Sequence, residues 1–101
     1  MTRENEKPIE TTDPFARRLI GKYLSHRKDD IGKLTQALAE SDFETIRVTG
    51  HNLYGSGAAY GLDQISHFGA NFEKAADARN VLEIERLIGE LTDFLDKLRV
   101  S

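Results

Sequence analysis

Small and apolar residues recur along most of this chain at intervals of three and four positions, the spacing that gathers side chains on one face of an α-helix. Four runs with this spacing follow one another. They comprise Phe15, Leu19, Tyr23, Leu24, Ile31, Leu34 and Leu38, then Phe43, Ile46, Gly50, Leu53, Gly57 and Tyr60, then Leu62, Ile65, Phe68, Gly69, Phe72, Ala75 and Ala76, and finally Ile84, Leu87, Ile88, Leu91, Phe94, Leu95 and Leu98. The pattern therefore predicts four amphipathic helices.

Helix-capping signals place the boundaries of these runs. The Asp13-Pro14 pair suits a helix start, because Asp accepts from free amides and Pro has no amide to leave unpaired at the first helical position. Ser41-Asp42-Phe43-Glu44 fits a capping box with its Ser as N-cap, and Asn80-Val81-Leu82-Glu83 repeats that logic. Gly61 is expected to end the second helix, since it adopts positive φ without strain. The third helix is expected to extend to Arg79.

The links left between the helices are very short, and short links make consecutive helices antiparallel neighbours. The sequence therefore predicts an all-α fold, an antiparallel up-and-down four-helix bundle, over residues 13–101. Residues 1–12 carry mixed charges and a single Ile, so we expect a flexible, loosely packed N-terminal tail. Polar and Gly residues between positions 28 and 32 weaken the first run, which leaves open one long helix or two shorter ones.

Composition narrows the possible functions. The chain has 14 Lys plus Arg against 17 Asp plus Glu, a net charge of −3, so it lacks the basic excess typical of nucleic-acid binding. The absence of Cys excludes disulfides, thiolate metal sites and Cys nucleophiles. No apolar run approaches the roughly 20 residues of a membrane span, and the first residues do not resemble a secretion signal. A cytoplasmic location is therefore expected, without a membrane or nucleic-acid partner.

Several kinds of site are disfavoured by their surroundings. The Gly55–Gly61 segment is rich in glycine, but a predicted helix precedes it, whereas dinucleotide and phosphate loops follow a strand. Ser56 lacks the flanking glycines of a hydrolase nucleophile. His26, His51 and His67 share no helical turn, so no metal site is expected. We interpret His26 and His67 as solvated surface residues.

His51 differs from the other histidines in its neighbours. The turns of the second predicted helix place Arg47, His51, Tyr54, Gly55 and Ala58 on a strip beside the buried face. Gly55 removes a side chain one turn from the imidazole, at a cost of about 1 kcal/mol relative to Ala, which indicates that something approaches closely. Imidazole is mostly neutral near pH 7, and a neutral ring nitrogen can attack phosphorus. This strip fits a phosphoryl acceptor.

From about Asp13 to Leu98 the chain resembles the histidine-containing phosphotransfer (HPt) domains of bacterial and plant phosphorelays. That family carries His-x-Leu-Lys-Gly-Ser, then Gly and later Leu-Glu, matched here by His51, Leu53, Gly55, Ser56, Gly61, Leu62 and Phe72-Glu73. The resemblance implies a four-helix bundle with His51 phosphorylated, Gly55 admitting a receiver domain, and Glu73 facing the histidine from the third helix. Tyr54 occupies the position of the family's lysine, so the cation expected beside the phosphoryl group is missing.

The resemblance also implies a role. The chain would accept a phosphoryl group from a receiver-domain aspartyl phosphate and pass it to another receiver. Its partners would be response-regulator receivers or hybrid sensor histidine kinases, with no small-molecule substrate. It would be a phosphorelay intermediate and not a kinase, and it would need no cofactor of its own because the receiver would carry the Mg²⁺.

Two alternatives remain open at this stage. The domain could be an adaptor that binds receivers without phosphotransfer, which Tyr54 favours, or it could be phosphorylated by a separate chemotaxis-type kinase domain. Arg47 also has two interpretations, either a solvated helix charge or a replacement for the missing cation one turn before His51. Tyr54 itself could donate a hydroxyl to the phosphoryl group or contact a docked partner.

Overall fold

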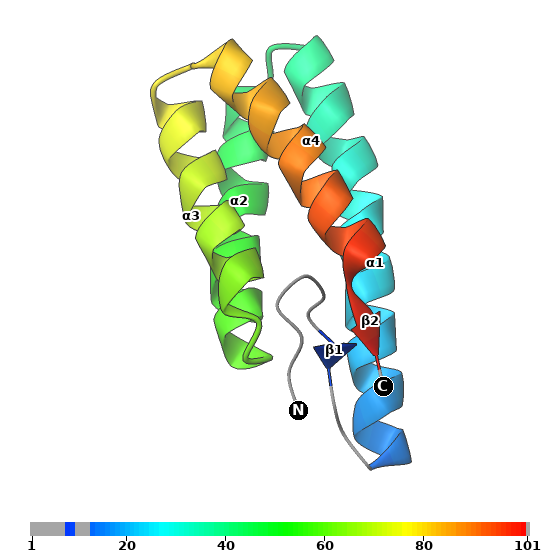
Figure 1. The fold of residues 1–101 in the computed structure, drawn as a ribbon. Helices are drawn as coiled ribbons and strands as arrows, with labels where there is room; N and C mark the ends of the chain where they lie inside the picture. Colours follow the sequence, from blue (N-terminus) through cyan, green and yellow to red (C-terminus); the bar gives the residue numbers. More distant parts are fainter. Residues whose placement is uncertain (1–7, 10–12, 101) are drawn as a thin grey trace.

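A computed structural model describes residues 8–9 and 13–100 of the chain. Within them lie four helices, α1 (Pro14–Ala39), α2 (Phe43–Ala59), α3 (Asp63–Asp77) and α4 (Val81–Lys97). They run alternately up and down against one another (Figure 1). This arrangement confirms the predicted all-α fold, an antiparallel up-and-down four-helix bundle.

Two short strands lie beside the bundle. β1 (Pro8–Ile9) pairs in parallel with β2 (Arg99–Val100), so that Pro8 lies opposite Arg99. The sequence did not predict this pairing, because two residues are too few to show an alternating pattern. Residues 1–7 and 10–12, which make up the rest of the predicted tail, lie outside the described residues. Their predicted flexibility stays a prediction.

The first helix is continuous through residues 28–32, so the first apolar run forms one long helix and not two shorter ones. α1 spans 26 residues without interruption. Asp30 lies between two cations, with its Oδ2 2.9 Å from Nε of Arg27 and its Oδ1 4.0 Å from Nζ of Lys33. Partial burial raises the pKa of Asp30 even beside these partners. Ile31 and Leu34 continue the core-facing stripe through this segment.

The three links between helices share one backbone design. Ser41, Gly61 and Arg79 have φ angles of 55°, 71° and 52°, in the left-handed region. In the α2–α3 link the Gly61 amide donates to the Ala58 carbonyl at 3.1 Å, and the next amide donates to the Gly57 carbonyl at 2.7 Å. This pair of bonds is a Schellman motif, and it turns the chain within a few residues. The third helix was expected to extend to Arg79, but it ends at Asp77, and Arg79 belongs to the link that follows.

Two of the three predicted N-cap residues are correct. Asp13 and Asn80 cap α1 and α4 as expected. The N-cap of α2 is Asp42 and not Ser41, because Ser41 occupies the left-handed position that ends α1. The Asp42 carboxylate accepts from the Thr45 hydroxyl at 2.6 Å and from the Thr45 amide at 3.1 Å, and these bonds lower the pKa of Asp42.

All four helices contribute to one core. Its fully buried large side chains are Leu34, Ile46, Leu53, Ile65, Phe72, Ile84, Leu87 and Leu91, all of them members of the predicted stripes. Phe15 and Leu19 were expected in the first stripe but are 66% and 42% exposed. α1 is the longest helix and extends past the ends of its neighbours there (Figure 1). Periodicity reports which face is apolar but not where the partner helix ends.

Candidate functional site

Glycines bring α2 and α3 into backbone contact. A Cβ atom on Gly50 would lie 2.8 Å from the Gly69 carbonyl oxygen, and one on Gly57 would lie 2.9 Å from Cα of Ser66. A Cβ atom on Gly69 would overlap the backbone of Tyr54 and Gly50. The two helices can adopt this spacing only because these positions lack a side chain. Side chains on the flank of α2 therefore lie within reach of side chains on α3.

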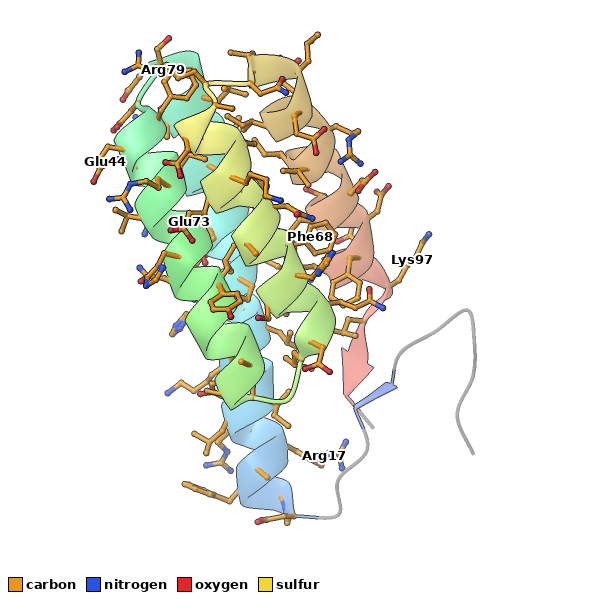
Figure 2. All side chains as sticks on the ribbon, turned by 90° about the vertical axis from the view of Figure 1, so that its left-hand side faces the viewer. Arg17, Glu44, Phe68, Glu73, Arg79 and Lys97 are labelled. Carbon is orange, nitrogen blue, oxygen red and sulfur yellow. The ribbon has the colours of Figure 1, made fainter. Side chains whose placement is uncertain are left out.

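His51 and Glu73 meet across this close pair of helices. The His51 Nδ1 atom lies 3.5 Å from Oε1 of Glu73, and the two side chains are 67% and 32% exposed. Figure 2 looks onto the side of the bundle formed by α2 and α3, where Glu73 lies. His51 directly follows the buried Gly50, so its ring emerges at the edge of the helix contact. Among the described residues, Nε2 of His51 has no hydrogen-bond or ion-pair partner, and the His51 side chain is mostly exposed.

His51 lines an open hollow between the two helices, which we call the His51 hollow. Its other lining residues are Tyr54 of α2 and Ala70, Glu73, Lys74 and Asp77 of α3. The hollow thus places an imidazole, a phenol, two carboxylates and an ammonium around one opening. Lys74 and Asp77 were missed by the sequence analysis. Lys74 lies four positions after Ala70 and Asp77 lies four positions after Glu73, and this spacing was the signal that they share one helix face.

Arg47 is occupied by a neighbour on its own helix. Its guanidinium donates two hydrogen bonds to the Glu44 carboxylate, at 2.6 and 3.1 Å. These bonds raise the pKa of Arg47 and lower that of Glu44. The charges of Glu73 and Asp77 also raise the pKa of Arg47, so this cation lies within electrostatic reach of the His51 hollow. It is not one of the lining residues.

Gly55 and Ala58 continue the exposed strip beyond His51. Both are exposed, and a Cβ atom on Gly55 would meet nothing within 4 Å. Tyr54 is 51% exposed, and its backbone carbonyl accepts a hydrogen bond from the Ser66 hydroxyl at 2.8 Å. Gly55 therefore serves no packing contact among the described residues, in contrast to Gly50 and the other glycines at the helix contact.

Ser56 has a structural partner set that the sequence analysis did not foresee. Its hydroxyl lies 2.8 Å from the Tyr23 hydroxyl and accepts from Arg27 at 3.3 Å. Tyr23 also stacks on Tyr60 with ring centroids 4.2 Å apart, and the Arg27 guanidinium lies over the Tyr23 ring. This cluster joins α1 to α2 and holds the helix that carries His51.

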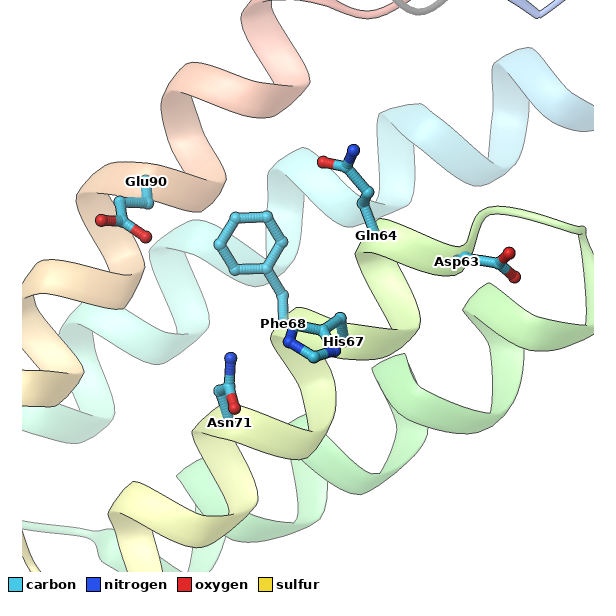
Figure 3. A pocket seen from close by; sticks show the side chains of 6 residues that line it. All are labelled: Asp63, Gln64, His67, Phe68, Asn71 and Glu90. Carbon is cyan, nitrogen blue, oxygen red and sulfur yellow. The ribbon is translucent and has the colours of Figure 1, made fainter.

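The remaining histidines are apart from this site. His26 is exposed on α1. His67 lines a second hollow, on the α3–α4 side of the bundle, together with Asp63, Gln64, Phe68, Asn71 and Glu90 (Figure 3). The described residues contain no group of three or more His, Asp or Glu side chains that could hold a metal ion. Nor does any described helix combine the length and apolarity needed to cross a bilayer.

Comparison with known proteins identifies the family. Neither the curated proteins nor the solved structures gave a match. The family model described as the Hpt domain matches residues 18–101, which covers most of the chain and all of α2, α3 and α4. The chain therefore belongs to the Hpt domain family.

Proposed function

We propose that this chain is a phosphorelay intermediate in which His51 accepts a phosphoryl group from the aspartyl phosphate of a receiver domain and passes it to another receiver. Hpt domains are phosphotransfer intermediates of two-component signalling and not kinases. They interact with receiver and kinase components. A cytoplasmic location goes with this role.

The observation that carries the proposal is the contact between His51 and Glu73. A carboxylate 3.5 Å from Nδ1 favours the tautomer with its proton on that nitrogen. The lone pair then resides on Nε2, which has no partner among the described residues. A distance of 3.5 Å is long for a hydrogen bond, and such contacts often shorten when the reacting complex forms.

The transfer step balances without any further reactant. The Nε2 lone pair attacks phosphorus, and the bond between phosphorus and the receiver's aspartate oxygen breaks, with its electron pair returning to the carboxylate. The imidazole keeps its Nδ1 proton and gains positive charge, which the Glu73 carboxylate offsets. We expect the receiver to supply the Mg²⁺ that shields the transferring oxygens. This chain contributes a positioned nucleophile.

One structural feature favours a second candidate, the adaptor that binds without transfer. Tyr54 lines the His51 hollow and is 51% exposed, and an exposed aromatic side chain is a typical docking contact. A third reading keeps the acceptor role of His51 but takes the phosphoryl group from a chemotaxis-type kinase domain. The three candidate functions differ in which protein donates the phosphoryl group and in whether the group is transferred to His51 at all.

The test measures binding and transfer in parallel. Candidate receivers are phosphorylated, and their affinity for this chain and the appearance of acid-labile phosphate on it are followed over time, with His51→Gln as the control. The proposal predicts rapid transfer to wild type and none to the control, with receiver binding retained by both. Tight receiver binding without transfer to wild type would establish the adaptor and overturn the shuttle.

A further inference from the structure

We infer that Lys74 is the cation that binds the phosphoryl group while it resides on His51. This inference rests on the proposed function of His51 and adds a residue on the neighbouring helix that no sequence motif assigns. Lys74 lines the same hollow as His51, reaching it from α3 while His51 reaches it from α2.

The charges of the hollow call for such a cation. A phosphoryl group carries a charge of about −1.5 to −2 near neutral pH. The His51 hollow already contains the carboxylates of Glu73 and Asp77, which repel an arriving anion. The lining offers Tyr54 as a neutral donor and Lys74 as a charged one. A charged donor binds phosphate oxygens more strongly than a neutral donor.

Lys74 is available for this contact. It is exposed, and no ion pair links it to any residue in the described part of the chain. A second cation, Arg47, lies near the hollow, but its guanidinium donates two hydrogen bonds to Glu44. A four-carbon side chain such as that of Lys74 can swing toward a new anion without disturbing a partner.

The backbone places Lys74 on the correct side. It directly follows Glu73, the residue that contacts His51, and it lies one helical turn beyond Ala70. Ala70 also lines the hollow, and its small side chain occupies little of the space there. The ammonium can therefore approach an oxygen on Nε2 while Glu73 keeps its contact with Nδ1.

The test uses the whole chain phosphorylated by phosphoramidate, a small donor that needs no receiver. The pKa of the phosphoryl group on His51 is then followed by ³¹P NMR titration in wild type, Lys74→Gln, Lys74→Arg and Lys97→Gln. Lys97 is the matched control because it is exposed at the end of α4, away from the α2–α3 side (Figure 2). Removing a nearby cation disfavours the dianion, so Lys74→Gln should raise this phosphoryl pKa by about 0.2 to 0.7 pH units.

The expected pattern is a raised phosphoryl pKa in Lys74→Gln alone, with Lys74→Arg and Lys97→Gln close to wild type. Equal pKa values in Lys74→Gln and wild type would overturn the role of Lys74 and leave His51 as acceptor. A shift of the same size in Lys97→Gln would also overturn it, because net charge would then explain the effect. Phosphate on other residues and not on His51 would overturn both the acceptor and its cation.

Discussion

Nδ1 of His51 and Oε1 of Glu73 lie 3.5 Å apart although they belong to different helices. Glycines at the α2–α3 contact make this proximity possible, since a Cβ atom at Gly50 or Gly69 would separate the two backbones. This contact makes the two nitrogens of the imidazole different from each other. Nδ1 lies beside a carboxylate, whereas Nε2 has no hydrogen-bond or ion-pair partner among the described residues.

Replacing Glu73 should change the balance between the two imidazole tautomers. A partly exposed contact between a carboxylate and an N–H is worth about 0.5–1 kcal/mol, so Glu73→Ala should reduce the ratio of the Nδ1–H to the Nε2–H form about two- to fivefold. ¹⁵N NMR of the His51 ring measures this ratio. Glu73→Gln retains an acceptor oxygen, so its tautomer ratio should lie between those of wild type and Glu73→Ala. An unchanged ratio in Glu73→Ala would show that the carboxylate does not orient the ring.

Gly55 should be required for transfer and not for folding. A side chain there meets open space, so Gly55→Gln should stabilise the fold by about 0.5 kcal/mol through helix propensity while transfer from a receiver slows sharply. Gly89→Gln is the matched control, because Gly89 also faces open space in a helix but lies on α4. Thermal unfolding and transfer kinetics are measured on both. Equal transfer rates for the two variants would refute a docking role for Gly55.

Gly69 should behave in the opposite way. A Cβ atom there would overlap backbone atoms of α2, so Gly69→Ala should cost about 1–3 kcal/mol in the free energy of unfolding as the helices are forced apart. Gly89→Ala meets nothing within 4 Å and should stabilise the chain by up to about 1 kcal/mol. Denaturant titration compares the two. If Gly69→Ala proved as stable as wild type, the backbone contact between α2 and α3 would not be as close as described.

Acid should weaken the start of α2 through Asp42. Hydrogen bonds from Thr45 hold the pKa of Asp42 below its ordinary value of 3.8 in the folded chain. A depressed folded pKa contributes stability that is complete above the unfolded pKa and is lost as the pH falls through the folded one. Asp42→Asn keeps a cap that does not titrate, so its stability should fall less steeply below about pH 4. Denaturation midpoints across pH 2–6 measure this, and parallel curves for both proteins would contradict it.

The fold was predictable because its signals are local. The spacing of apolar residues indicates the buried face of each helix. Short links such as the one at Gly61 make consecutive helices antiparallel neighbours, which favours the up-and-down bundle. The features that were predicted wrongly depend on parts of the structure outside the segment itself. Ser41 and Asp42 are both good caps, and only the left-handed turn that ends α1 assigns the role to Asp42. Phe15 is apolar and in phase, yet α1 extends beyond the helices that would cover it.

The candidate site divides in the same manner. His51 and Gly55 could be identified from one helix, since a histidine with an open approach is visible in its own turn. Lys74 could not, because its relation to His51 depends on how closely α2 and α3 pack. Arg47 was a possible substitute cation in the sequence, and the structure pairs it with Glu44. For a site built from two helices, the sequence therefore indicates the residues on each helix but not which of them meet.

The central claim is that His51 is the phosphorylated residue, and direct mapping of the phosphate tests it. The chain is incubated with a phosphorylated receiver, digested at alkaline pH, where phosphohistidine survives, and analysed by mass spectrometry. We expect phosphate on the His51 peptide alone, and none on His51→Gln protein whose circular dichroism remains helical. Phosphate on His26 or His67, or continued labelling of His51→Gln, would contradict it.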